Sequence, residues 1–249
     1  MLVFSKLTKI INEKGAAYIV LIDPDKKNSG SIIEKVEKAN ISSVDALFIG
    51  GSLIMDNELN KRVKQIKLFS KIPLILFPGG VGQLNKHYDA MLFMSLISGR
   101  NPHYLIGEQV ITAPLVKDLN IETISTGYIL IEGGSCSTVE FMSGTRPIPR
   151  NKIDLIISHA LAGQYLGMKM IYLESGSGAE LPISVEVVSA IKETLDVPII
   201  VGGGIKSPEV AHKLVKAGAS LVVTGSIIEK DQNLMNEIAH AVHWKNNAC

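Results

Sequence analysis

Val197-Pro-Ile-Ile-Val-Gly-Gly-Gly-Ile205 and Ser220-Leu-Val-Val-Thr-Gly-Ser-Ile227 are the stretches that decide the fold. Each starts as a β-branched run and ends in a glycine turn, which predicts a strand followed by a tight loop. Between them, Ser207-Pro208-Glu209 opens an amphipathic stretch typical of a capped helix. Glycine loops and helix N-termini both present backbone N–H groups to anions. Two successive units of this kind are typical of the phosphate site of a (β/α)₈ barrel, so we expect a phosphorylated ligand.

The same alternation runs through the whole chain of 249 residues, a length close to that of a typical (β/α)₈ barrel. Strands are expected at 18–22, 46–49, 73–77, 90–95, 122–131, 169–173, 197–201 and 220–223. Helices are expected at 31–40, 57–70, from 101 onward, and at 153–166, 182–195, 207–217 and 233–244. This order predicts an α/β fold with one parallel barrel domain over residues 1–249.

Two connections depart from the regular pattern. Only residues 78–89 separate the third and fourth strands. A crossover helix needs about a dozen residues of its own, so the third helix is expected to be reduced or missing. Residues 132–150 form a second long loop, expected on the face where the strands end.

Composition excludes several classes of function. The formal net charge is +1, which gives no electrostatic footprint for nucleic acid. The two cysteines, Cys136 and Cys249, make neither a disulfide framework nor a metal cluster. No apolar run reaches the roughly 18 residues of a membrane span, and the first residues lack a secretory pattern. We therefore expect a cytoplasmic protein without a transmembrane segment or a nucleic-acid partner.

Residues that directly follow the strands of a barrel share one face, where active sites lie. On this face the sequence places carboxylates, hydroxyls and glycines but no histidine or cysteine, which argues against nucleophilic triads and zinc chemistry. The residues are Asp23, Asp25, Ser52, Gly79, Gly80, Tyr128, Glu132, Tyr172, Glu174, Ser175, Gly176, Gly203, Gly204, Gly225 and Ser226.

Asp23 and Asp25 flank a proline, which fits either a hard oxygen site for Mg²⁺ or carboxylates that cap a turn. The position at the end of the first strand favours the metal, more so for Asp23. Ser52 is either a ligand of metal or phosphate or an N-cap. Glu174 is either a general base on a substrate hydroxyl or a salt-bridged loop residue, and the glycines beside it favour the base. Tyr128 and Tyr172 are either substrate hydrogen-bond donors or amphipathic rim aromatics.

Eight segments in order resemble the geranylgeranylglyceryl phosphate synthase family, including its bacterial heptaprenylglyceryl phosphate relatives. The resemblance covers nearly the whole chain. The segments are Leu21-Ile-Asp-Pro-Asp-Lys26, Ile49-Gly-Gly-Ser52, Phe77-Pro-Gly-Gly80, Ser98-Gly-Arg-Asn-Pro102, Thr126-Gly-Tyr-Ile129, Tyr172-Leu-Glu-Ser-Gly-Ser-Gly178, Val201-Gly-Gly-Gly-Ile205 and Val223-Thr-Gly-Ser-Ile227.

The resemblance implies a barrel without a regular third helix and a prenyltransferase. Enzymes of this family join C3 of sn-glycerol 1-phosphate to a long prenyl diphosphate through an ether and release diphosphate. By resemblance, Asp23 and Ser52 hold the Mg²⁺ that carries the diphosphate, and Glu174 accepts the proton of the attacking hydroxyl. The glycerol phosphate then lies on Tyr172, Leu173, Glu174, Ser175, Gly176, Ser177 and Gly178, with its phosphate on Gly203, Gly204, Gly225 and Ser226.

The chain departs from the family at two positions. Some relatives carry lysine where Leu21 stands, and many carry asparagine where Ser226 stands. Serine still donates a hydrogen bond, so the phosphate site is expected to survive with a changed contact.

A prenyl tail requires an apolar groove, for which Phe93, Met94, Ile129 and Ile131 are candidates, although at least two of the four are expected to be barrel core. Geranylgeranyl is the first expectation for the tail, but the sequence does not determine its length. The resemblance also implies a homo-oligomer, either dimer or hexamer, and the lipid product implies transient contact with a membrane.

Two other interpretations remain open. A sugar-phosphate isomerase or an indole-glycerol-phosphate type of barrel shares the phosphate loops, but it needs a second acid or a lysine at the end of the fifth strand, where Gly127 and Tyr128 stand. A non-catalytic phosphate-binding barrel does not explain why Asp23, Ser52 and Glu174 occur together.

Overall fold

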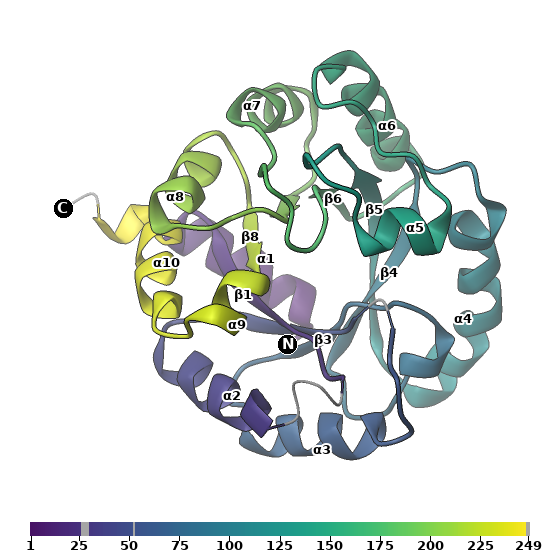
Figure 1. The fold of residues 1–249 in the computed structure, drawn as a ribbon, viewed down its shortest axis with the longest axis vertical. Coiled ribbons are helices and arrows are strands. Elements are labelled where there is room, and N and C mark those ends of the chain that lie inside the picture. The colour runs from purple at the N-terminus through teal and green to yellow at the C-terminus, as the bar shows by residue number, and fades with distance from the viewer. Residues whose placement is uncertain (26–29, 52, 248–249) are drawn as a thin grey trace.

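The computed structural model describes residues 1–25, 30–51 and 53–247. Eight parallel strands follow one another in chain order and close into a barrel (Figure 1), as predicted. The strands are β1 (Ala17–Ile22), β2 (Ala46–Ile49), β3 (Leu74–Leu76), β4 (Ala90–Leu96), β5 (Glu122–Leu130), β6 (Met170–Glu174), β7 (Ile199–Gly202) and β8 (Leu221–Thr224). The first strand closes the barrel on the last, with Ile19 paired to Val223.

Helices surround the barrel on the outside (Figure 1). They are α2 (Ile32–Ile41), α3 (Leu59–Phe69), α4 (Glu108–Leu119), α6 (Ile153–Tyr165), α7 (Val185–Thr194), α8 (Pro208–Lys216) and α10 (Leu234–Val242), with a π-helical turn η3 (His103–Gly107) before α4 and a 3₁₀ turn η4 (Trp244–Asn247) after α10. The reduced third helix is confirmed, since the connection between β3 and β4 holds only the 3₁₀ turn η2 (Val81–Gln83). In the described part of the chain, no helix has both the length and the apolarity to cross a bilayer.

Three helices were not predicted: α1 (Val3–Lys14), α5 (Thr138–Ser143) and α9 (Ser226–Lys230). Helix α5 lies within the expected loop 132–150, where the side chain of Ser137 caps it by accepting from the backbone N–H of Glu140.

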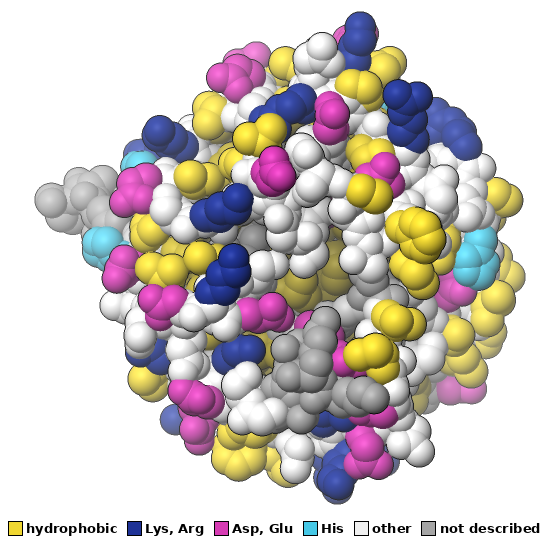
Figure 2. All heavy atoms as spheres, viewed as in Figure 1, with side chains coloured by type: hydrophobic (Ala, Val, Ile, Leu, Met, Phe, Trp, Pro, Cys, Tyr) yellow, Lys and Arg dark blue, Asp and Glu magenta, His cyan; other side chains and the backbone are white. Residues whose placement is uncertain are grey.

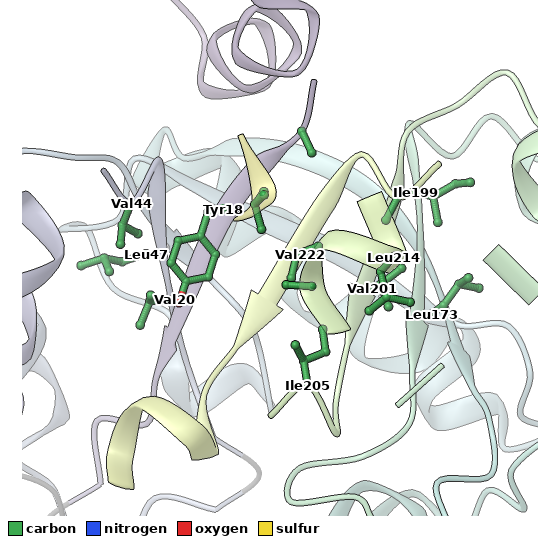
Figure 3. Close-up of a cluster of buried hydrophobic side chains, with 14 of the residues drawn as sticks. Tyr18, Val20, Val44, Leu47, Leu173, Ile199, Val201, Ile205, Leu214 and Val222 are labelled. Carbon is green, nitrogen blue, oxygen red and sulfur yellow. The ribbon is translucent and has the colours of Figure 1, made fainter. Parts of the chain in front are cut away.

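Side chains alternate along each strand between the barrel interior and the layer beneath the helices. The interior is filled by residues such as Ile19, Phe48 and Leu92. The outer layer contains Val20, Leu47, Leu173, Val201 and Val222, which lie between the strands and the surrounding helices (Figure 3).

The end of the barrel where the strands begin is closed. Helix α1 contributes the buried side chains of Val3 and Leu7 to the interior cluster. Its first turn is held to the start of β5, because the backbone N–H of Phe4 donates to the Glu122 carboxylate at 3.0 Å. Side chains of α1 thus fill the barrel interior at this end, whereas residues at the ends of the strands line a cavity at the other.

A buried polar cluster ties the C-terminal segment to this closed end. The Asp45 carboxylate accepts from the Tyr18 backbone N–H at 2.8 Å, from Lys14 Nζ at 2.7 Å and pairs with His243 Nε2 at 2.7 Å. Burial opposes the ionisation of Asp45, but the bonds from His243 and Lys14 outweigh it and hold the pKa below its ordinary value.

Candidate active site

A cavity of about 650 Å³ opens where the strands end. Figure 2 shows this hollow at the centre of the face, with hydrophobic side chains in its floor. Its polar part is lined by Asp23, Tyr128, Tyr172, Glu174, Ser177, Gly178, Gly203, Gly204, Gly225 and Ser226. The structure thus brings most of the predicted site residues into one cavity.

Glu174 is the last residue of β6 and points into the cavity with only 7% of its surface exposed. Its Oε1 accepts from the backbone N–H of Gly176 at 2.6 Å. Burial raises the pKa of this carboxyl to about 7, although the hydrogen bonds from Gly176 and from the Tyr172 hydroxyl act in the opposite direction. A carboxyl that titrates near neutral pH is suited to accept a proton from a substrate hydroxyl.

The turn after β7 requires glycine for reasons of backbone geometry. Gly203 and Gly204 have φ angles of 82° and 66°. A Cβ on Gly203 would lie 2.5 Å from Glu174 Oε1 and 2.5 Å from Ser175 Oγ, and a Cβ on Gly204 would lie 2.7 Å from the backbone nitrogen of Pro182. The two glycines therefore let the turn lie directly against the β6 loop.

Gly225, in the turn after β8, differs from these two glycines. Its φ is −131°, and a Cβ there would meet its nearest neighbour, Leu21 Cβ, at an ordinary 3.5 Å. Protein packing thus does not require glycine at this position, and the space that its missing side chain leaves belongs to the cavity. Across this space Ser177 Oγ lies 3.3 Å from Ser226 Oγ. Backbone and hydroxyl groups of this kind form a cradle for an anion.

Two lysines that the sequence analysis did not single out also line the cavity. Lys206 follows the β7 glycine turn, where its Nζ donates to the Glu180 carbonyl at 3.0 Å, and Lys230 ends α9. Each lysine lies a few residues after a glycine turn that was predicted to bind an anion. This position in the sequence could have indicated that both lysines line the site. They add positive charge on the side of the cavity where the anion cradle lies.

Asp23 lines the cavity directly after β1, and its Oδ1 accepts from the Asp25 backbone N–H at 3.0 Å. A Cβ on Gly51 would lie 2.6 Å from the same oxygen, so the glycine leaves room beside the carboxylate. Asp25 is fully buried, lies outside the cavity lining and accepts from the Met55 backbone N–H at 2.9 Å. The two carboxylates therefore have different roles, and Asp25 holds the β2–α3 loop.

The predicted metal ligand Ser52 lies outside the described residues. Among the residues that are described, no group of three or more His, Cys, Asp or Glu side chains is arranged to hold a metal. A cation beside Asp23 would take most of its ligands from a substrate phosphate and water, as Mg²⁺ usually does.

Three residues of the predicted glycerol phosphate stretch do not line the cavity. Alternation along β6 places the Leu173 side chain in the outer layer (Figure 3), so the predicted contact with glycerol phosphate would have to come from its backbone. The Ser175 hydroxyl donates to the Gly202 carbonyl at 3.4 Å, and the Gly176 backbone N–H donates to Glu174 Oε1. Ser175 and Gly176 therefore stabilise the loop after β6 without lining the cavity.

Aromatic rings form part of the cavity wall beside Glu174. The ring centroids of Tyr128 and Tyr172 lie 5.2 Å apart, and that of Phe77 lies 5.5 Å from Tyr172. Burial, and then the nearby Glu174, raise the pKa of both tyrosines well above the ordinary value, so the phenols remain neutral.

The cavity also has an apolar arm that reaches the outer face of β4. Phe93 and Met94 line it, whereas Ile129 and Ile131 are buried in the outer core. The arm further contains Leu84, Met91, Leu96, Tyr104, Thr112, Val139 and Met142. A regular helix between β3 and β4 would cover the outer face of these strands, so its absence leaves the space for the arm.

The model of the PcrB family matches residues 8–242. Geranylgeranylglyceryl phosphate synthase of Chitinophaga pinensis is 46% identical over 91% of this chain and 90% of the relative. The protein of that name from Pyrococcus horikoshii is 45% identical over 92% of this chain and 91% of its own.

Solved structures agree. (S)-3-O-geranylgeranylglyceryl phosphate synthase from Thermoplasma acidophilum, in complex with substrate sn-glycerol-1-phosphate, superposes with a TM-score of 0.90 at 31% identity, over 98% of this chain and 99% of that chain. Thiamine phosphate pyrophosphorylase from Pyrococcus furiosus, with a TM-score of 0.59 at 12% identity, shares only the fold. With a family model that matches almost the whole barrel and relatives above 40% identity, this chain belongs to the PcrB family.

Proposed function

We propose that the protein joins sn-glycerol 1-phosphate to a long-chain prenyl diphosphate, with geranylgeranyl diphosphate as the first candidate. The product is an ether at C3 of the glycerol, an intermediate of ether lipid synthesis, and diphosphate is released. One observation carries the proposal: a single cavity combines an anion cradle, a buried carboxyl whose pKa is about 7 and an apolar arm. The names of the relatives, and the glycerol phosphate in the Thermoplasma acidophilum structure, support the same substrates.

In this proposal each cavity residue contacts the part of the substrates that lies nearest to it. The glycerol phosphate group lies on Gly203, Gly204, Gly225 and Ser226, close to Lys206. The C3 hydroxyl then points toward Glu174, which takes its proton as the oxygen bonds to C1 of the prenyl group. The bond between C1 and the diphosphate oxygen breaks, and its electron pair leaves with the diphosphate. Holding both reactants in one cavity removes much of the entropic cost of this step.

Mg²⁺ is part of this proposal. A hard carboxylate oxygen of Asp23 borders the cavity beside the bare Gly51, which suits a cation that takes its other ligands from phosphate and water. Asp23, with Ser52 as the second predicted ligand, would hold the ion. When bound, Mg²⁺ neutralises charge on the leaving diphosphate.

The test is an assay of ether formation with sn-glycerol 1-phosphate and a ladder of prenyl diphosphates, with and without Mg²⁺. We expect product and diphosphate only when both substrates and the metal are present. Binding of glycerol phosphate without turnover on any prenyl diphosphate would instead favour a non-catalytic barrel. Turnover of a sugar phosphate alone would favour the isomerase class, although the cavity-lining residue near the end of β5 is Tyr128, not an acid or lysine.

Self-association is a further part of the proposal. Ile106, Val110, Ile111 and Leu115 are 45–64% exposed along η3 and α4 and form an apolar stripe. We expect this stripe to pair with a second copy, and sedimentation of wild type against Val110→Asp measures it.

Contact with a lipid surface is proposed for the open face of the barrel. Leu53, Met55 and Met142 are exposed there and also line the cavity, so an apolar path runs from the cavity to the surface. Co-flotation with vesicles loaded with prenyl diphosphate tests this contact.

A further inference from the structure

Four aromatic rings meet inside the open end of the barrel. Phe77, directly after β3, has its ring centroid 5.5 Å from that of Tyr172 and 6.1 Å from that of Tyr128, with interplanar angles of 50° and 57°. Phe48 stacks on Phe77 at 6.0 Å and 14°. Phe77, Tyr128 and Tyr172 line the cavity, whereas Phe48 is fully buried and does not. The cavity wall is thus aromatic on this side, with an aromatic support behind it.

This aromatic wall lies between Glu174 and Asp23, the proposed base and the proposed metal ligand. At one end the Tyr172 hydroxyl lies close to Glu174, since a Cβ on Gly202 would lie within 3 Å of both the hydroxyl and Glu174 Oε2. At the other end the backbone of Phe77 adjoins the β2 turn, since its carbonyl would lie 1.8 Å from a Cβ on Gly50. The next residue of that turn, Gly51, lies against the Asp23 carboxylate. The rings therefore border the path from the proposed base to the proposed diphosphate site.

The proposed reaction develops positive charge on the prenyl group. As the C1–O bond of an allylic diphosphate breaks, C1 carries positive charge shared with C3 of the prenyl chain. Among the described residues, the lysines that line the cavity are Lys206 and Lys230, which follow β7 and β8 on the phosphate side. The faces of aromatic rings attract a cation, most strongly when water is excluded.

We propose that Phe77 is a further catalytic residue whose ring, together with those of Tyr128 and Tyr172, faces the allylic carbon and stabilises its positive charge as diphosphate leaves. This inference rests on the proposed function. It adds no reactant: the C1–O bond electrons leave with diphosphate, the glycerol oxygen forms the new bond to C1, and Glu174 takes the proton.

The test replaces Phe77 with 4-fluoro-, 3,5-difluoro- and 3,4,5-trifluorophenylalanine, which weaken the attraction of the ring for a cation while nearly preserving its shape. Single-turnover rates of ether formation are measured with saturating geranylgeranyl diphosphate and sn-glycerol 1-phosphate. We expect the rate to fall stepwise with each fluorine, to a total of roughly 2- to 30-fold. The dissociation constant for geranylgeranyl diphosphate should change little.

Phe48 is the matched control, because it belongs to the same ring cluster but does not reach the cavity. The same fluorinated series at Phe48 should leave the single-turnover rate unchanged. Phe77→Tyr should retain most of the rate that Phe77→Leu loses, with similar melting temperatures for both.

The outcomes separate the inference from the function on which it rests. Equal rates across the Phe77 series in a protein that makes the ether would overturn the role of the ring and leave the function intact. An equal decline in the Phe48 and Phe77 series would overturn it as well, since the effect would then be one of packing. A wild-type protein that forms no ether would overturn both.

Discussion

At the scale of single residues, the chemistry is set by where a carboxylate lies. Glu174 and Asp25 are both buried acids, yet Glu174 faces the cavity and Asp25 accepts a backbone N–H from the neighbouring loop. The sequence predicted that Glu174 and Asp25 follow strands. The position of Asp23 at the end of the first strand favoured Asp23 over Asp25 as the metal ligand. The sequence did not show the burial of Glu174, because burial depends on the β7 turn that packs against it.

Glu174→Gln keeps the shape of the side chain but removes its ability to take a proton. We expect kcat to fall by about 10²–10⁴-fold, as is typical for loss of a general base. In wild type, activity should rise as pH increases through about 7, where the carboxyl loses its proton. That acidic limb of the kcat profile should vanish in the variant. If the limb persists unchanged, another group is the base and Glu174 only binds substrate.

Asp23→Asn tests the metal assignment. The amide removes the negative charge that faces the cavity, so turnover and its Mg²⁺ dependence should both be lost. Calorimetric titration with sn-glycerol 1-phosphate should give a nearly unchanged dissociation constant, because the anion cradle lies after β7 and β8. Turnover close to wild type would remove Asp23 from the mechanism.

At the scale of secondary structure, all eight strands were predictable because each is a short apolar run that ends in a turn. The missed helices were short or lay where no strand–helix alternation pointed to them. For α5 a signal existed: Ser137 and Glu140 have the spacing of a capping box, and Ser137 caps the helix in the structure. For α1 the residue before the first turn, Leu2, makes no side-chain cap, so the sequence carries no start signal.

The two glycine turns should respond differently to alanine. Gly204→Ala places a side chain at a φ of 66° and within 3 Å of Pro182, so the melting temperature should fall. Gly225→Ala meets only ordinary contacts and should melt like wild type, yet its methyl group enters the anion cradle. Calorimetry should then show at least tenfold weaker glycerol phosphate binding for Gly225→Ala. Unchanged binding would place the phosphate elsewhere in the cavity.

At the scale of the whole molecule, one end of the barrel contributes to stability and the other end carries the cavity. One end is sealed by α1 and by the polar cluster of Asp45, Lys14 and His243, and the other end is open. The sequence indicated which end would be active, because the chemical residues follow the strands. The sequence did not predict the contacts that close the other end, because the residues that make them are far apart in the chain: Asp45 and His243 are separated by 198 residues.

His243→Ala should act on stability alone. It removes a buried hydrogen bond to Asp45 and leaves that carboxylate less well paired, which costs about 1–3 kcal/mol in the free energy of unfolding. Denaturant unfolding measures the loss, and kcat per folded molecule should equal that of wild type. A fall in kcat with unchanged stability would contradict the separation of the two ends.

The burial of Glu174 also has a thermodynamic consequence for the resting enzyme. A carboxyl whose pKa is about 7 in the native state and near 4.5 in the unfolded chain binds its proton more tightly when folded. The folded state therefore loses stability as pH rises from about 4.5 to 7, and the full cost, roughly 3–4 kcal/mol, is present at alkaline pH. Glu174→Gln should accordingly melt at a higher temperature than wild type at pH 8, and at a similar temperature near pH 4.5. The free energy of unfolding of the enzyme would then be lowest at the alkaline pH where its activity is highest. In each catalytic cycle the proton that Glu174 takes from glycerol phosphate would remove this destabilisation for as long as the carboxyl holds it.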